Sequence, residues 1–229
     1  MSKYYNIGDA LAKYSNSEGN VSNKLMRFYD GASTTDLYAV RSVGIDPATG
    51  REEFRKKDGS LTYIYDTNDQ VKVGNSTPIV EGIIGTAFYY KGLSCNINFR
   101  YRNGGQIFLQ TLYDKVENIG EKDLRQNQDK RALYGRWKKP GDNAKFKAIS
   151  LTEETPISSR FVADENTFSC ESITVNYESQ AKWLKYAGIT SLTLSASTSD
   201  IFRISSVKNE RGLNYPFQRS VNFSVGIRF

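Results

Sequence analysis

Residues 220–229 alternate without a break between apolar side chains and polar or small ones. The apolar members are Val221, Phe223, Val225, Ile227 and Phe229. A period of two residues is typical of a β-strand with one apolar and one polar face. About ten residues is also what a tilted strand needs to cross a bilayer. Alternation alone is equally compatible with a half-buried strand of a soluble sheet.

Four further stretches have strand character: residues 79–90, 93–102, 167–177 and 189–202. The second is the most regular. Its apolar residues Leu93, Cys95, Ile97, Phe99 and Tyr101 alternate with Ser94, Asn96, Asn98, Arg100 and Arg102. That polar face would meet water in a soluble two-layer protein, or would line the lumen of a barrel.

The stretch 167–177 alternates with a change of phase. Phe168 and Cys170 are in one register, whereas Ile173, Val175 and Tyr177 are in the other. One extra residue would produce this change, so the sequence predicts a β-bulge around Glu171-Ser172.

The connections between these strands alternate in length. Lys91-Gly92 and residues 180–188 are short, whereas residues 103–166 and 203–217 are long. Short turns on one side and long loops on the other are typical of a bacterial outer-membrane barrel. The 103–166 region also carries a basic cluster, which is either a solvated loop surface or a contact for anionic lipopolysaccharide or a glycan: Arg125, Lys130, Arg131, Arg136, Lys138, Lys139, Lys145 and Lys147.

The division predicted is a polar loop region, residues 1–78, followed by five barrel strands in residues 79–229 with the terminal strand at 220–229. The first region contains a short amphipathic helix on Ile7, Ala10, Leu11 and Tyr14. It also contains a turn at residues 46–50 and a hairpin with a two-residue turn at Asp58-Gly59. The start of the chain lacks the apolar core of a signal peptide, so we expect either a cytosolic protein or a piece of something longer.

Composition excludes several classes of protein. Mean hydropathy is −0.54, and no apolar run reaches the length of a transmembrane helix. The net charge is +6 with both signs spread along the chain, so we predict no nucleic-acid binding.

Histidine is absent, which rules out Ser-His-Asp and Cys-His catalysis and any histidine metal site. The two cysteines, Cys95 and Cys170, are too far apart in sequence for a metal motif and fall in predicted strands as small apolar residues. The best-placed carboxylates lie in polar loops with nothing to perturb them: Asp66, Asp69, Glu153 and Glu154. We therefore predict no enzyme, no cofactor and no metal.

The C-terminal aromatic of the terminal strand resembles the assembly signal of outer-membrane barrels. Seven motifs in order then resemble the C-terminal part of SusC/RagA-type TonB-dependent outer-membrane transporters, over about residues 37–229. They are Leu37-Tyr-Ala-Val-Arg-Ser-Val-Gly-Ile-Asp-Pro-Ala-Thr-Gly50, Thr77-Pro78, Tyr90-Lys-Gly92, Gly135-Arg-Trp-Lys-Lys-Pro-Gly-Asp-Asn143, Ser159-Arg-Phe-Val-Ala-Asp164, Ile173-Thr-Val-Asn-Tyr177 and Tyr215-Pro-Phe-Gln-Arg-Ser220. The sequence departs from the family pattern at Asp200-Ile-Phe202, where Asn-Leu-Phe is common.

The resemblance implies an all-β fold, with antiparallel up-and-down strands forming the C-terminal portion of a transmembrane β-barrel with long extracellular loops. Family barrels have about 22 strands and a plugged lumen. The implied activity is TonB-driven uptake of glycans or peptides across the outer membrane of a Gram-negative bacterium.

The implied partners are outer-membrane lipid, the remainder of the transporter chain, TonB, a SusD-type lipoprotein and the barrel assembly machinery. Five strands cannot close such a barrel, so we expect this chain to be a fragment. The alternative is a soluble β-sandwich, a carbohydrate-binding or surface-adhesion module, in which strands 93–102 and 220–229 would face each other.

Overall fold

The computed structural model describes residues 3–4, 25–27, 29–121, 123–150, 153–186, 188–208 and 219–229. The predicted helix containing Ile7, Ala10, Leu11 and Tyr14 lies outside these residues. The chain divides into two compact units. The loop unit comprises Met1–Thr77 and Gly105–Asp164, and the strand unit comprises Pro78–Gly104 and Glu165–Phe229.

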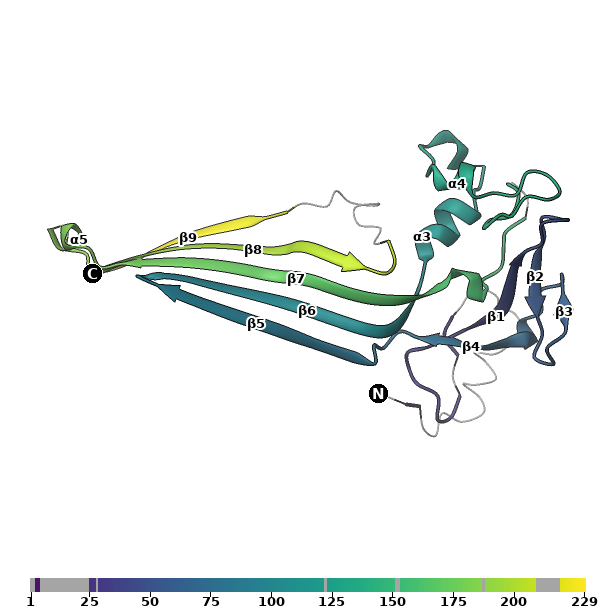
Figure 1. Ribbon diagram of the computed structural model, residues 1–229, viewed down its shortest axis with the longest axis horizontal. Helices are drawn as coiled ribbons and strands as arrows, with labels where there is room; N and C mark the ends of the chain where they lie inside the picture. Colours follow the sequence, from purple (N-terminus) through teal and green to yellow (C-terminus); the bar gives the residue numbers. More distant parts are fainter. Residues whose placement is uncertain are drawn as a thin grey trace. The chain divides into compact units, whose positions relative to one another are not determined.

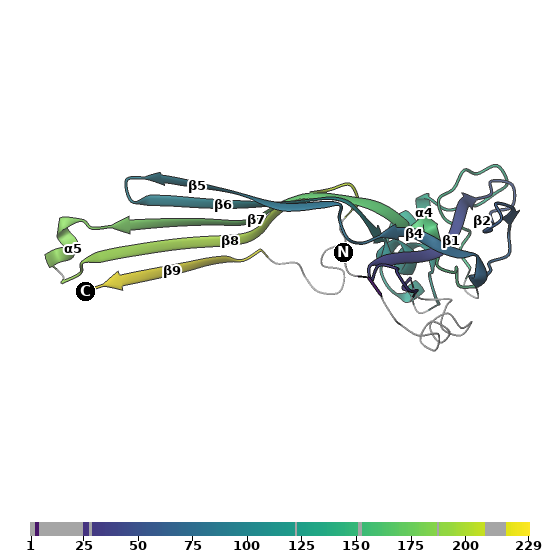
Figure 2. The same cartoon turned by 90° about the horizontal axis from the view of Figure 1, so that it is seen from below.

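The strand unit is built on one five-stranded sheet of order β5-β6-β7-β8-β9, so neighbours in sequence are neighbours in the sheet (Figures 1 and 2). Its strands are β5 (Val80–Tyr90), β6 (Leu93–Phe108), β7 (Val162–Ser179), β8 (Ser191–Ser205) and β9 (Val221–Arg228). The pairs β5–β6, β7–β8 and β8–β9 are antiparallel. All five predicted strands form. However, β6 and β7 extend into the predicted 103–166 loop.

The short connections follow the predicted turn chemistry. Tyr90 and Leu93 pair across the two-residue turn between β5 and β6. Its central residues Lys91 and Gly92 both have positive φ, 46° and 84°, as a type I′ hairpin turn requires. The connection between β7 and β8 contains the short helix α5 (Lys182–Tyr186).

An irregularity in strand pairing occurs where the sequence predicted a bulge. Cys170 lies opposite Phe202, and Ser172 lies opposite Ser199. Between these two pairs β8 has one residue more than β7, and Asp200 of β8 has a φ of 55°. The bulge is therefore confirmed in position, and in the pairing of β7 with β8 the extra residue lies on β8.

The loop unit contains a four-stranded sheet of order β3-β2-β1-β4, where the sequence predicted only a hairpin. Its strands are β1 (Asp36–Ile45), β2 (Glu52–Arg55), β3 (Leu61–Thr62) and β4 (Gln70–Asn75). The turn at residues 46–50 is confirmed by a 2.8 Å hydrogen bond from the Gly50 N–H to the Asp46 carbonyl.

The predicted hairpin at Asp58-Gly59 also forms, but not with a two-residue turn. The Lys56 N–H donates to the Ser60 carbonyl at 2.9 Å, which leaves a three-residue loop. Gly59, at its end, has a φ of 91°, and such loops favour glycine at the left-handed position.

The connection between β6 and β7 folds back onto the small sheet. A 3-10 turn, η1 (Thr67–Asp69), lies elsewhere in the loop unit, directly before β4. The β6–β7 connection itself contains α3 (Gln110–Leu112), the π-helical turn η2 (Tyr113–Glu117), η3 (Asp123–Arg125), α4 (Arg131–Tyr134) and η4 (Ser159–Phe161). Its apolar side chains form the core of the loop unit with one residue of β1: Ala39, Tyr113, Val116, Ile119, Ala132, Phe146, Ile157 and Phe161. Much of the predicted polar loop is therefore a packed structure.

Candidate functional site

The strand unit has one continuous apolar face. The apolar residues of β9 pair with Thr198, Ala196, Leu194 and Leu192 of β8, which in turn pair with Ile173, Val175, Tyr177 and Ser179 of β7. Residues directly opposite each other share a face of the sheet. The alternation seen in the sequence therefore lines up across three strands.

The remaining two strands continue this face. Tyr90, Phe88 and Ile84 of β5 lie opposite Leu93, Cys95 and Phe99 of β6. The Phe99 ring stacks on Phe168 of β7, with centroids 5.5 Å apart. Many of these side chains are open to solvent in the isolated chain, among them Phe88 at 60% and Phe223 at 79%. An exposed apolar surface of this extent marks contact with a membrane or a protein partner.

The opposite face is polar and hydrogen-bonded. Asn98 donates to Ser172 Oγ at 3.1 Å, and Asn176 donates to Ser94 Oγ at 3.3 Å. Arg100 forms ion pairs with Glu81, at 2.8 Å, and with Glu171. Glu171 and Ser172 thus both contact polar-face residues of β6, which explains the change of phase at the bulge.

The candidate assembly residues lie along an edge strand. β9 pairs with β8 on one side, and its other edge has no strand partner within the described part of the chain. Val221, Phe223, Val225 and Ile227 share the apolar face, and Phe229 follows β9 and is 84% exposed. β5 likewise has no strand partner on its outer edge among the described residues. Such edges pair readily with other strands.

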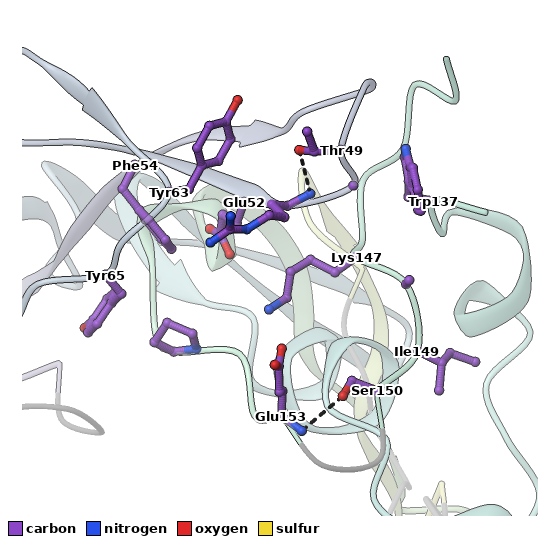
Figure 3. A pocket seen from close by; sticks show the side chains of 14 residues that line it. Thr49, Glu52, Phe54, Tyr63, Tyr65, Trp137, Lys147, Ile149, Ser150 and Glu153 are labelled. Atoms are coloured by element: carbon purple, nitrogen blue, oxygen red, sulfur yellow. Dashed lines mark hydrogen bonds between the residues drawn. The ribbon is translucent and has the colours of Figure 1, made fainter. Parts of the chain in front are cut away.

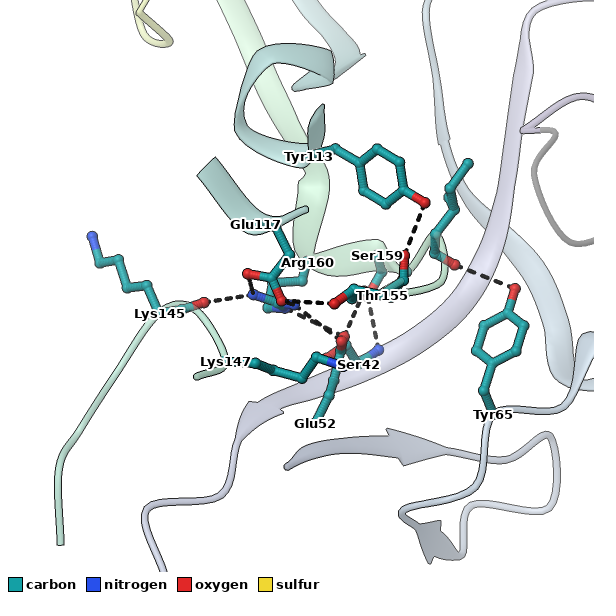
Figure 4. Close-up of polar contacts among 12 residues, drawn as sticks. Ser42, Glu52, Tyr65, Tyr113, Glu117, Lys145, Lys147, Thr155, Ser159 and Arg160 are labelled. Atoms are coloured by element: carbon teal, nitrogen blue, oxygen red, sulfur yellow. Dashed lines mark hydrogen bonds and ion pairs between the residues drawn. The ribbon is translucent and has the colours of Figure 1, made fainter. Parts of the chain in front are cut away.

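The loop unit is held together by a buried ionic cluster around Arg160, which lies in η4 (Figure 4). Its Nη2 lies 3.0 Å from Glu52 Oε2 of β2 and 2.7 Å from Glu117 Oε1 of η2. Both carboxylates are buried, and each accepts a further hydrogen bond, from Ser158 Oγ at 2.6 Å and from Thr155 Oγ1 at 3.2 Å. The cluster therefore joins three segments far apart in sequence.

Burial by itself lowers the pKa of Arg160, but the hydrogen bonds and charges of Glu117 and Glu52 outweigh it, and the net direction is upward. Arg136 lies beside this cluster and donates to the carbonyls of Val116, Glu117 and Lys147. Burial lowers the pKa of Arg136. The Arg136 guanidinium is buried and hydrogen-bonded to backbone carbonyls, so the prediction that Arg136 belongs to a solvated basic loop surface is wrong.

An open pocket of about 360 Å³ lies next to this cluster, between the β2–β3 hairpin and residues 147–150, 153 and 156 (Figure 3). Its aromatic walls are Phe54, Tyr63, Tyr65 and Trp137, and its charged residues include Arg51, Glu52, Lys147 and Glu153. Arg51 stacks over the Tyr63 ring, 5.3 Å from its centroid. Aromatic walls with a few polar groups suit a small ligand of mixed character.

Sequence reasoning missed both the cluster and the pocket, because their residues are separated by up to 108 positions. The carboxylates that it considered are placed as ordinary turn and loop residues. Asp66 accepts from the Asn68 N–H at 2.8 Å and Asp69 from the Lys57 N–H at 3.1 Å, whereas Glu153 lines the pocket. Cys95 and Cys170 are free thiols in β6 and β7.

Among the described residues, no cluster of His, Cys, Asp and Glu side chains could hold a metal ion. Nor does any helix in that part of the chain have the length and apolar character needed to span a membrane.

Comparison with solved structures identifies the fold. A RagAB peptide importer in its open-open state matches with a TM-score of 0.70 and 17% identity, over 88% of this chain and 23% of that one. A second RagAB peptide transporter structure matches with a TM-score of 0.65, 15% identity and coverage of 79% and 20%. The closed-closed state of the importer matches with a TM-score of 0.63 and 16% identity, over 79% of this chain and 20% of that one.

The chain has the fold of a SusC/RagA-type transporter segment. The resemblance that the motifs indicated and the predicted fold class, antiparallel strands of a barrel transporter, are thereby confirmed. The chain spans between a fifth and a quarter of the length of the transporter chains that it matches. No protein-family model matches the sequence, and no curated protein is similar enough to serve as a relative.

Proposed function

We propose that this chain is the C-terminal part of a TonB-dependent outer-membrane transporter that imports a nutrient, and that it has no enzymatic role. The observation that carries the proposal is the two-faced, five-stranded sheet, with its apolar face continuous over all strands. Lipid would cover that face, and the hydrogen-bonded polar face would line the barrel interior.

The alternation of connections supports the same function. The links β5–β6 and β7–β8 are short, whereas β6–β7 and β8–β9 are long. In outer-membrane barrels the short turns are periplasmic and the long loops extracellular. The loop unit would then meet the nutrient outside the cell, with its aromatic pocket as the first candidate for contact. Because the similar structures are of a peptide importer, a peptide is the first substrate to test, before a glycan.

The unpaired edges of β5 and β9 call for partners. In hydrocarbon an unpaired strand edge is strongly unfavourable. We propose that the rest of the transporter chain supplies strands for both edges, and that the barrel assembly machinery recognises Val221, Phe223, Val225, Ile227 and Phe229. A SusD-type lipoprotein and TonB would complete the importer.

A soluble β-sandwich gains no support from the topology. That alternative requires β6 and β9 to face each other, but they are members of one sheet, with their apolar residues on the same face.

Fractionation of native cells tests the proposal, with an antibody raised against residues 123–150. We expect the signal in the outer membrane, in a band several times larger than the 25.9 kDa of this chain. External protease should remove the epitope from intact cells, while a periplasmic marker stays protected. A 25.9 kDa band in the soluble fraction would overturn the proposal.

A further inference from the structure

Two arginines of the loop unit lie directly opposite each other on neighbouring strands. Arg41 of β1 pairs with Arg55 of β2, so both side chains project from the same face of the sheet. Like charges in this position destabilise a sheet. In the part of the chain that the structure describes, neither guanidinium forms an ion pair or a side-chain hydrogen bond. Within the described residues, no ion pair or side-chain hydrogen bond therefore offsets the repulsion between these two arginines.

Both arginines line one open pocket of about 410 Å³. Its other residues are Ser42, Val43, Lys72, Val73 and Ser159, so it contains three cations and no carboxylate. Its volume is in the range of small-molecule pockets, roughly 300–1,000 Å³.

The third cation is partly neutralised. Lys72 Nζ lies 2.7 Å from Asp36 Oδ1, and the lysine side chain is 49% exposed. The unbalanced charge of the pocket is thus that of Arg41 and Arg55. Ser159 adds a donor, because its Oγ accepts from the Ser42 N–H at 2.9 Å and its own hydroxyl proton is left for another acceptor (Figure 4).

Guanidinium groups bind phosphate-type oxyanions through paired, charge-assisted hydrogen bonds. A group with two negative charges would match the two unpaired arginines and remove their repulsion. A carboxylate, with one charge, would neutralise only one of them. We propose that this pocket binds a phosphate or sulfate group, carried by a small molecule such as a sugar.

Binding can be measured on the full chain in a nonionic detergent that contains no phosphate. The probes are inorganic phosphate, inorganic sulfate and glucose 6-phosphate, each compared with sodium chloride at equal ionic strength. We expect all three to raise the melting temperature beyond the effect of chloride. A stronger effect of glucose 6-phosphate than of phosphate would identify a sugar-borne ester as the preferred source.

Arg41→Ala and Arg55→Ala should each weaken phosphate binding by about tenfold or more, as expected for loss of a charge-assisted contact. Without phosphate, these variants should be at least as stable as the parent chain, because the repulsion is gone. Arg55→Lys keeps the charge but loses the planar fork, and should bind with intermediate affinity. Lys56→Ala is the matched control, since it removes one cation from the same hairpin but does not line the pocket.

Two results would overturn the proposal. One is a melting temperature that phosphate raises no more than chloride does. The other is a Lys56→Ala variant that loses as much phosphate affinity as Arg41→Ala, which would reveal a general charge effect. Either result leaves the transporter proposal intact, because that proposal rests on the strand unit.

Discussion

The indole ring of Trp137 lies directly against the backbone of Gly50. A Cβ atom at residue 50 would come within 2.4 Å of the ring, and Gly50 has a φ of +70°. Trp137 Nε1 also donates to the Pro47 carbonyl at 2.9 Å. The ring therefore packs the turn at residues 46–50 against the β6–β7 connection, and it forms one wall of the aromatic pocket.

Gly50→Ala should lower the free energy of unfolding of the loop unit by about 3 kcal/mol, because the left-handed backbone and the clash both add cost. Urea unfolding followed by tryptophan fluorescence measures this. Gly59→Ala is the control, since Gly59 has a φ of +91° but nothing within 4 Å of its Cβ position. It should cost about 1 kcal/mol from backbone strain alone. Equal losses in the two variants would contradict the contact with Trp137.

Arg160→Met should destabilise the loop unit by about 3–5 kcal/mol, because it leaves the carboxylates of Glu52 and Glu117 buried without their cation. The same urea titration measures the loss. Lys115→Met provides the comparison, since Lys115 pairs with Asp123 at 3.5 Å and is 56% exposed. That change should cost less than about 1 kcal/mol. An Arg160→Met loss of similar size would show that the cluster is solvated rather than buried.

The sequence predicted the strand unit well, because the alternation of apolar and polar residues along a strand can be recognised within a short stretch of sequence. The five predicted stretches form the five strands, and the change of phase between Cys170 and Ile173 located the bulge. The loop unit was largely missed for a physical reason. Asp36 and Glu52 are buried in its strands, where they form ion pairs with Lys72 and Arg160, so these strands do not show the alternation of apolar and polar residues.

The pocket that contains Arg41 and Arg55 could not be predicted from the sequence either. Arg41 and Arg55 are 14 positions apart and become neighbours only through the β1–β2 register. Nor does the sequence separate Arg136, buried in the loop unit, from solvated neighbours such as Lys138, because both are basic residues in a polar run. Long-range pairing, not residue type, decides which charges meet.

Tyr113 gives the loop unit a sensitivity to alkaline pH. Its hydroxyl donates to the Thr155 carbonyl at 2.8 Å. Burial, together with the charges of Glu154 and Asp114, raises the pKa of Tyr113 to about 12. In the unfolded chain it is about 10. The neutral phenol thus stabilises the fold fully below pH 10, and this contribution is lost as the pH rises toward 12.

Tyr113→Phe should therefore be less stable than the parent chain at pH 8, and the difference should shrink between pH 10 and 12. Urea titrations of both chains at several pH values measure it. Tyr134→Phe, at an exposed tyrosine of α4, should show no such trend. A Tyr113→Phe difference that stays constant up to pH 12 would contradict the shifted ionisation.

The apolar face of β9 is where membrane insertion can be tested. Phe223→Lys places a charge on the proposed lipid face, which costs about 2–4 kcal/mol at the bilayer midplane. We expect a clear loss of the protein from the outer-membrane fraction of native cells, measured by immunoblot. Phe229→Ala should also reduce the outer-membrane signal, but by slowing assembly rather than by burying a charge.

Ser224→Lys is the matched control for the strand. Ser224 is adjacent to Phe223 but projects from the polar face of the sheet, where it pairs with Ser195 of β8. In a barrel that face meets water, so the added charge should be tolerated and the outer-membrane signal should be close to that of the parent chain. If the two lysine variants behave alike, the two faces of β9 are not in different solvents. The strand would then be an edge of a sheet with water on both sides, and the transporter proposal would fail at its main support.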